Sequence, residues 1–144
     1  MTNVLRQYCT FFVNKMFFGV EVEKVQEVIR YQNMTRVPLA PAEICGLINL
    51  RGQIVIAIDL RKRLAFAERH NDKLPMNVVM HDNVGAVSFL VDDIGDVLEV
   101  DENAFEPPPP TLFGKQRKLI RGAYKLKNGL LLALDAEKTM DLSV

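Results

Sequence analysis

Neither sign of charge is in excess in this sequence of 144 residues, in which 18 lysine and arginine residues balance 18 aspartate and glutamate residues. A balanced chain has no net field to attract nucleic acid or an anionic membrane surface, so neither class of partner is favoured. We therefore expect the chain to recognise its partners through shaped surface patches rather than through overall charge.

Long hydrophobic runs are also missing. The longest apolar stretches, residues 129–134 and the interrupted run at 11–20, fall well short of the roughly 20 residues that a membrane-spanning helix needs. Near the N-terminus, Asn14 and Lys15 interrupt the apolar residues, so the segment lacks the apolar region and cleavage site of a secretory signal peptide. The sequence therefore predicts a cytoplasmic protein without a transmembrane segment.

Residues and motifs that carry metal or catalytic chemistry are scarce. Cys9 and Cys45 lie within apolar segments, with no second Cys or His at the spacing of a zinc site, so we expect buried free thiols. His70 and His81 lie in polar or turn sequences, which favours exposed side chains. Phosphate-binding loops, the GxSxG elbow and HExxH are absent from the sequence. We predict no catalytic residue, no metal and no cofactor.

Short apolar runs rich in Val, Ile and Phe make up most of the chain, and residues typical of turns bound many of them. This pattern predicts an all-β protein with short helices. Between residues 17 and 29 the apolar spacing changes from two to three and four, which predicts a strand followed by a helical turn. A second short helix is expected over 135–140, with Asp135 as its N-cap.

Four consecutive prolines at 107–110 offer no backbone donors, so residues 106–114 are unsuited to a central strand. We predict a linker or surface loop here. A ligand for an SH3-type domain is the functional alternative for this segment.

Two pairs of segments match each other without a gap. Residues 44–59 match 120–135 at an offset of 120 minus 44, or 76, and residues 20–28 match 89–97 at an offset of 89 minus 20, or 69. Duplicated small β units usually pack together with a groove between them, and such grooves are common partner sites. The sequence therefore predicts two similar halves with a functional groove between them, while chance similarity between apolar strands is the alternative.

Arg51 is the polar residue whose setting is most suggestive of function. It precedes Gly52, which can adopt a positive φ and turn the chain tightly. A guanidinium favours bidentate pairing with a carboxylate, within the fold or across an interface, and Glu27 on the predicted helical turn is the candidate partner. The alternative is a solvated hairpin arginine that contributes little to stability.

The chain resembles the CheW-type chemotaxis coupling proteins from about residue 8 to residue 140. The most specific similarities are VQE at 25–27, the pattern PxxIxGxxNLRG at 41–52 and DLR at 59–61. The resemblance implies two SH3-like five-stranded β-barrel lobes packed on a shared core. It implies one CheW-like domain over 1–144 made of two intertwined lobes, the first at about 15–80 and the second at about 84–135, with termini that contribute to the packing.

The resemblance also implies a function, that of a non-catalytic scaffold that couples chemoreceptors (methyl-accepting chemotaxis proteins) to the regulatory domain of the histidine kinase CheA. It places on the kinase-facing side Val22, Glu27, Gly46, Leu47 and Arg51. It places near the receptor groove Val25, Val78, Ser88 and Val97. The alternatives from other classes are an SH3-like peptide-binding module outside chemotaxis and a small enzyme.

Overall fold

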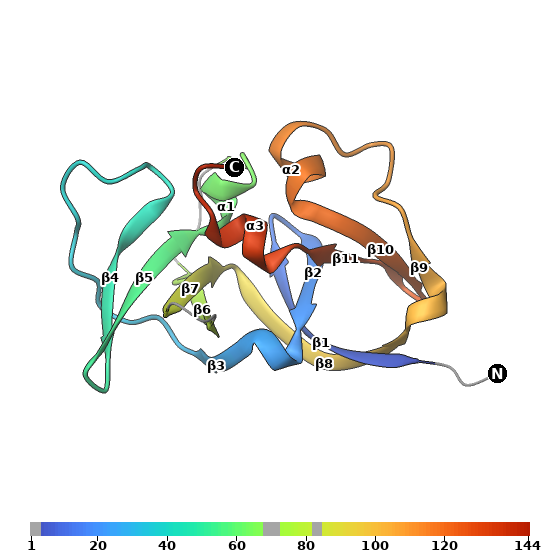
Figure 1. Ribbon diagram of the computed structural model, residues 1–144, viewed down its shortest axis with the longest axis horizontal. Helices are drawn as coiled ribbons and strands as arrows, with labels where there is room; N and C mark the ends of the chain where they lie inside the picture. The colour runs from blue at the N-terminus through green and yellow to red at the C-terminus, as the bar shows by residue number, and fades with distance from the viewer. Residues whose placement is uncertain (1–3, 68–72, 82–84) are drawn as a thin grey trace.

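Two β-sheets make up most of the structure, a computed structural model that describes residues 4–67, 73–81 and 85–144 (Figure 1). One sheet has the strand order β8 (Asp93–Asp101), β1 (Leu5–Val13), β2 (Met16–Glu21), β11 (Gly129–Leu134), β10 (Ile120–Leu126) and β9 (Phe105–Glu106). The other has the order β3 (Val25–Ile29), β6 (Met76–His81), β7 (Ala86–Val91), β5 (Gln53–Asp59) and β4 (Ile44–Leu50). The predicted all-β class is confirmed, and the short β9 gives the first of these sheets six strands instead of five.

Short helical segments join the strands: η1 (Val22–Lys24), α1 (Leu60–Arg63), η2 (Glu102–Ala104), α2 (Gly114–Leu119) and α3 (Ala136–Met140). The predicted cap of α3 is confirmed, because the Asp135 carboxylate accepts a hydrogen bond from the Lys138 N–H. The four prolines lie between β9 and α2, outside regular secondary structure, as predicted for a loop. Of the helices in the described ranges, none has the length and apolar character needed to cross a membrane.

The predicted helical turn before residue 29 is shorter than expected. Only η1 is helical, and Glu27 lies in the strand β3, where it is paired with Val79 of β6. The apolar spacing of three and four misled the prediction because η1 and β3 follow each other directly. Pairing with β6 then decides the conformation of β3, as tertiary contacts often override a local pattern.

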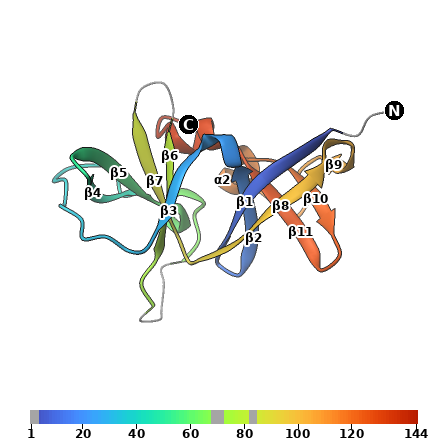
Figure 2. The same cartoon turned by 90° about the horizontal axis from the view of Figure 1, so that it is seen from below.

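The chain crosses between the two sheets twice, once through η1 and once at Asp92, between β7 and β8 (Figure 2). We call the unit around the five-stranded sheet the first lobe and the unit around the six-stranded sheet the second lobe. These sheets divide the chain differently from the expected boundaries of 15–80 and 84–135. Strand β7 pairs with β5 and β6 in the first lobe, while β1 and β2 belong to the second. The matching segments 20–28 and 89–97 are the two crossings, so the lobes are intertwined.

The repeat at the offset of 76 is visible in the register of the strands. The pairing of β4 with β5 shifts between the first and third residues of β4, and the pairing of β10 with β11 shifts at the same place. The third residue is glycine in both hairpins, and a neighbouring backbone lies against it: the carbonyl oxygen of Thr35 at Gly46, and that of Glu106 at Gly122. A side chain at either position would meet this backbone, so both hairpins are built alike.

Three apolar clusters stabilise the described part of the molecule. One cluster lies within the first lobe around Val55, and one lies within the second lobe around Tyr124. The largest joins both lobes, because Phe11 and Phe18 of the second pack in one cluster with Phe89 of the first. Each large side chain that is fully buried contributes about 1.5 to 3 kcal/mol to folding. The shared core therefore accounts for the close packing of the two lobes.

Candidate functional site

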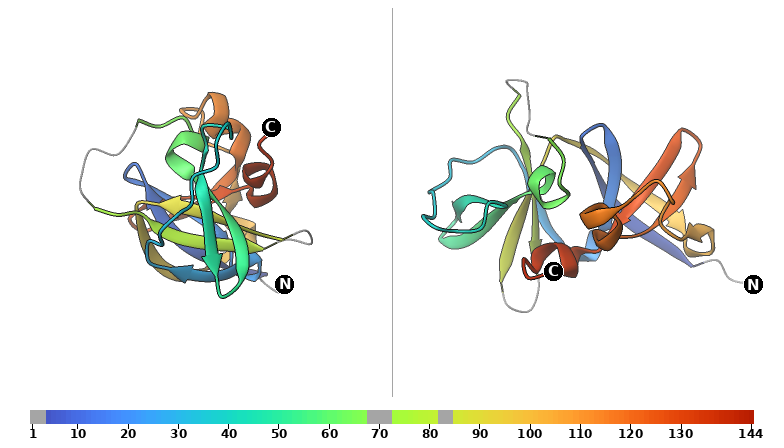
Figure 3. Two further views of the ribbon diagram at one scale, coloured as in Figure 1. Left: turned by 90° about the vertical axis from the view of Figure 1, so that its left-hand side faces the viewer. Right: turned by 90° about the horizontal axis from the view of Figure 1, so that it is seen from above.

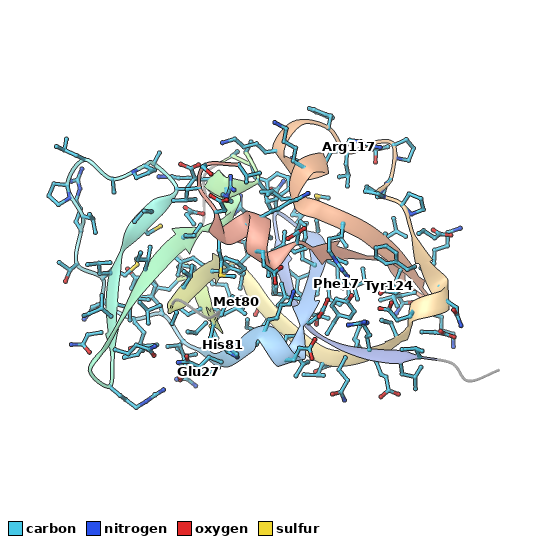
Figure 4. All side chains as sticks on the ribbon, viewed as in Figure 1. Phe17, Glu27, Met80, His81, Arg117 and Tyr124 are labelled. Carbon is cyan, nitrogen blue, oxygen red and sulfur yellow. The ribbon has the colours of Figure 1, made fainter. Side chains whose placement is uncertain are left out.

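An ion pair between Arg51 and Glu27 lies on the surface of the first lobe, and Figure 4 labels Glu27. Arg51 and Gly52 form the tip of the β4–β5 hairpin with φ angles of 50° and 87°, both in the left-handed region. The Gly52 N–H donates to the Asn49 side chain at 2.9 Å, which fixes the turn. From this tip the Arg51 Nη2 donates to Oε2 of Glu27 in β3. The predicted pairing is confirmed, as a single contact between these two atoms rather than the bidentate form.

The ion pair closes the sheet of the first lobe on itself. Strand β3 is one edge of this sheet, and the β4–β5 hairpin forms the other edge. Gln26 of β3 also donates to the side chain of Gln53 in β5, at 3.2 Å. Two side-chain contacts therefore bring opposite edges together, which is the curvature that a barrel-like lobe needs.

Both charges of the pair are stabilised, and the charge of Arg51 is largely exposed. The hydrogen bond from Arg51 lowers the pKa of Glu27, with help from Gln26, and the Glu27 carboxylate raises the pKa of Arg51. The Arg51 side chain is 71% exposed and that of Glu27 is 22% exposed. An exposed ion pair contributes little to folding. Its charges remain open to solvent and therefore to a partner.

Apolar side chains along the same hairpin are also exposed. Ile54 is 58% exposed and Ile56 is 39% exposed, and the half-buried Leu47 lies directly opposite Ile56 on β4. We call these three residues the hairpin strip. Groups of exposed apolar residues commonly mark protein interaction sites. The prediction named Leu47 but missed the two isoleucines. The sequence feature that could have identified them is the run IVIAI at 54–58, which makes both faces of β5 apolar.

The other predicted kinase-facing residues lie apart from this strip or beneath the surface. Gly46 is buried where the Thr35 backbone crosses it. Val22 lies in η1, is half-buried, and lines a shallow depression with Arg6 and Glu99. Of the five residues, the structure therefore brings Glu27, Leu47 and Arg51 to the surface of the first lobe.

The predicted receptor-groove residues divide into two accessible and two buried positions. Val97 of β8 is 56% exposed, and Val25 of β3 is half-buried against the shared core. Val78 and Ser88 are buried, and Ser88 donates to the Asn77 side chain at 2.7 Å. Neither Val78 nor Ser88 is available for direct contact with a partner on the folded chain.

An apolar hollow of about 780 Å³ lies within the second lobe. Its apolar wall includes Phe17, Leu98, Leu112 and Leu130, and Lys127 is at its margin (Figure 4 labels Phe17). The sequence predicted a groove between the lobes, whereas this hollow lies among β1, β2, β8, the proline loop and the β10–β11 hairpin. Leu130 occupies the repeat position of Ile54, since 130 minus 54 is 76. The equivalent hairpin of each lobe therefore presents an exposed apolar side chain.

The titratable groups that could support chemistry are dispersed. In the part of the chain that the structure describes, no set of three or more His, Cys, Asp and Glu side chains could hold a metal ion. Cys9 and Cys45 are free and only half-buried, and burial raises the pKa of both thiols, that of Cys45 to about 11. His81 is exposed, as expected, and His70 lies outside the described residues. Both thiols are protonated at neutral pH.

Comparison with known proteins gives a consistent result. The sequence model of the CheW-like domain matches residues 7–143. The chemotaxis protein CheW of Bacillus subtilis (strain 168) is 33% identical over 132 residues, which are 91% of this chain and 84% of that protein. CheW of Treponema pallidum (strain Nichols) is 27% identical over 136 residues, or 92% of this chain and 80% of that protein. The crystal structure of the scaffolding protein TtCheW from Thermoanaerobacter tengcongensis superposes with a TM-score of 0.81 at 27% identity, covering 91% of this chain and 89% of that one.

Proposed function

We propose, because this chain belongs to the CheW-like family of chemotaxis proteins, that it is a non-catalytic scaffold that couples chemoreceptors to the histidine kinase CheA in the cytoplasm. The observation that carries the proposal is the Arg51–Glu27 pair beside the hairpin strip. A rigid, exposed charge next to exposed apolar side chains has the composition of a protein interface, in which apolar contacts supply affinity and charges supply specificity.

The regulatory domain of CheA is the proposed partner of the first lobe. Its contact surface would comprise the hairpin strip, Arg51 and Glu27. The buried Gly46 would support this surface without contacting the partner, because it lets the Thr35 backbone pack closely against β4. Val22 would lie at the margin of this surface, since it belongs to the first crossing.

The cytoplasmic tip of a chemoreceptor is the proposed partner of a surface that both lobes share. Val25 begins β3 in the first lobe and Val97 lies in β8 of the second, so a receptor helix that contacts both would bridge the lobes. Buried Val78 and Ser88 would support this surface from within. Two modest and separate interfaces would suit a scaffold whose stability in a large assembly comes from multivalency.

Charge reversal at the ion pair tests the kinase surface. We expect Arg51→Glu to weaken binding to the CheA regulatory domain about tenfold or more, because it places two like charges side by side at the interface. The double variant Arg51→Glu with Glu27→Arg should recover part of the affinity. Titration calorimetry with the purified regulatory domain would measure both, and circular dichroism would verify folding.

Lys125→Glu is a matched control for this experiment. Lys125 forms an exposed ion pair with Glu106 at 3.4 Å in the second lobe, outside the proposed kinase surface. Its reversal should leave kinase binding unchanged. An equal loss in the single and double variants of Arg51, with folding intact, would contradict the role proposed for the pair.

The apolar hollow of the second lobe favours one alternative, a peptide-binding module outside chemotaxis. Such a module would bind a proline-rich or extended peptide and would not bind the kinase domain. Titration of proline-rich peptides, followed through amide resonances of residues at the hollow, distinguishes the two functions. Peptide binding together with no affinity for the CheA domain would favour the alternative.

A further inference from the structure

Arg63 is a fully buried arginine whose guanidinium is surrounded by backbone carbonyl oxygens. It lies at the end of α1 with 1% of its surface exposed. Its Nε donates to Thr139 at 3.0 Å, Nη1 donates to Val144 at 3.1 Å, and Nη2 donates to both Lys138 and Asp141 at 2.8 Å. The last carbonyls of a helix lack a full set of partners within the helix. Arg63 supplies a donor to Thr139 at the end of α3, and it adds a second donor at Lys138 and Asp141, whose carbonyls also accept the N–H groups of Asp141 and Val144.

These hydrogen bonds connect the two lobes. Helix α1 follows β5 of the first lobe, whereas α3 follows β11 of the second lobe. In space α3 lies between the lobes next to α1, with the C-terminus beside it (Figures 1 and 3). Arg63 and Thr139 occupy the same position of the repeat, since 139 minus 63 is 76. Arg63 therefore donates to Thr139, the residue at the equivalent position in the second copy of the repeat. This contact lies where the two copies meet.

Two ion pairs tie the same helices to the crossings of the chain. Arg61 of α1 binds Asp92 at the second crossing through two contacts, Nε to Oδ1 at 2.9 Å and Nη2 to Oδ2 at 2.8 Å. Glu137 of α3 binds Lys24 at the first crossing at 2.6 Å. Arg61 and Glu137 also share a repeat position, since 137 minus 61 is 76. Each helix is thus fixed to one crossing, and Arg63 fixes the helices to each other.

We propose that Arg63 is a positioning residue that holds the two lobes at one fixed orientation. Apolar contacts in the shared core are non-directional, so they permit small rotations between the lobes. Four hydrogen bonds from one planar, buried cation do not, because each donor direction is fixed by the guanidinium plane. Removal of the guanidinium should widen the range of relative orientations of the two lobes while each lobe stays folded.

The functional consequence rests on the function proposed above. A partner that contacts a single lobe is insensitive to the orientation between lobes. A partner that touches Val25 and Val97 together needs that orientation to be set in advance, since ordering it upon binding costs affinity. Arg63 therefore supports the receptor-facing surface and has no effect on the kinase-facing hairpin.

Distance measurement between the lobes tests the proposal without any partner. Spin labels would be attached to cysteines introduced in the two equivalent hairpins, at the exposed positions Ile54→Cys and Lys127→Cys, in a background with Cys9→Ala and Cys45→Ala. Pulsed electron resonance gives the distribution of distances between them. We expect a narrow distribution for the parent protein, and for Arg63→Met one that is about twofold broader or more, because Met retains the length but has no donors.

Further variants separate positioning from a general loss of stability. Arg63→Lys retains the charge but not the planar set of donors, so we expect an intermediate width. Arg117→Met is the control, since it removes an exposed arginine on α2 (Figure 4) and should leave the width unchanged. Circular dichroism would show that every variant is folded at the temperature of measurement. A distribution for Arg63→Met as narrow as that of the parent would overturn the proposal.

Binding to the two partners then tests the functional consequence. Arg63→Met should weaken binding to the receptor hairpin about fivefold or more and leave the affinity for the CheA regulatory domain within about twofold. Equal losses for both partners would contradict positioning. Failure of the parent protein to bind either partner would instead refute the proposed function, while the distance distributions would still decide the role of Arg63.

Discussion

Single residues in the second lobe form a closed ring of polar contacts that links four elements. Arg121 donates to the Tyr8 hydroxyl at 3.0 Å, and the Tyr124 hydroxyl donates to Glu102 at 3.1 Å. Since the Tyr124 proton is directed at Glu102, the 3.2 Å contact between the tyrosines has Tyr8 as its donor. Three ion pairs close the ring: Arg6 binds both Glu102 and Glu21, and Arg121 binds Glu21. Burial, followed by the contact with Tyr8, raises the pKa of Tyr124.

Removal of one hydroxyl from this ring should reduce stability measurably. We expect Tyr124→Phe to lower the free energy of unfolding by about 1 to 3 kcal/mol, because the buried Tyr8 hydroxyl loses its acceptor. Urea denaturation would measure the change. Tyr31→Phe, at a half-buried tyrosine outside the ring, is the control and should have a much smaller effect. Equal effects in the two variants would show that the ring has no special contribution.

The sequence gives partial information at this scale. Pairing of Arg51 with Glu27 could be predicted because a turn glycine marks the arginine and Glu27 is the acid on the predicted helical turn of the same half. The polar ring could not be predicted from the sequence. Its members come from β1, β2, η2 and β10, and their proximity depends on how these elements pack. Arg63 was missed for the same reason: its acceptors are backbone carbonyls, which leave no signal in the side-chain pattern.

At the scale of elements, the shifted hairpins explain Gly46 and Gly122, two glycines that lie within strands. A Cβ at Gly122 would meet the Phe105 ring as well as the Glu106 backbone. We expect Gly122→Ala to lower the free energy of unfolding by about 1 to 3 kcal/mol, since the backbone of β9 must move away.

Gly85→Ala is the matched control for this variant, because no atom of the described residues, apart from its chain neighbours, lies within 4 Å of a Cβ added there. Thermal and urea unfolding of both variants would measure the difference. Similar stability of the two variants would mean that β9 adapts without cost, and the close approach would then have no structural importance.

Elements were predicted well where the sequence pattern is local. The N-cap of α3, the proline loop and the repeated hairpins follow from a cap residue, missing donors and turn glycines. The conformation of Glu27 was not predicted, because a short helical segment and a strand that follow each other produce the spacing of a longer helix.

At the scale of the whole molecule, two crossings make the lobes interdependent. The offset of 69 between segments 20–28 and 89–97 differs from the offset of 76 between the hairpins, and this difference marks the crossings as a separate repeat unit. The prediction placed lobe boundaries by sequence order, whereas each lobe borrows strands from both halves of the chain. Only pairing between distant strands, such as parallel β5 with β7, reveals the exchange.

The link between the lobes should weaken in acid through the pair of Glu137 with Lys24. The hydrogen bond from Lys24 lowers the pKa of Glu137 below its usual value of 4.5 in the folded protein. A carboxylate with a depressed folded pKa stabilises the protein fully above its unfolded pKa, and this stabilisation is lost as the pH falls through the folded pKa. The interlobe pair should therefore contribute at pH 7 and lose its contribution below about pH 4.5.

Comparison of Glu137→Gln with the parent protein over this range tests the assignment. The variant should have a lower melting temperature than the parent at pH 7, by a few degrees at most because the Glu137 side chain is largely exposed. The two melting temperatures should converge as the pH falls through the lowered pKa of Glu137, because the parent carboxylate then becomes neutral as well. Scanning calorimetry from pH 7 to pH 3 would measure both curves. A constant difference across this range would show that the effect of Glu137 is one of packing, and that its charge does not join α3 to the first crossing.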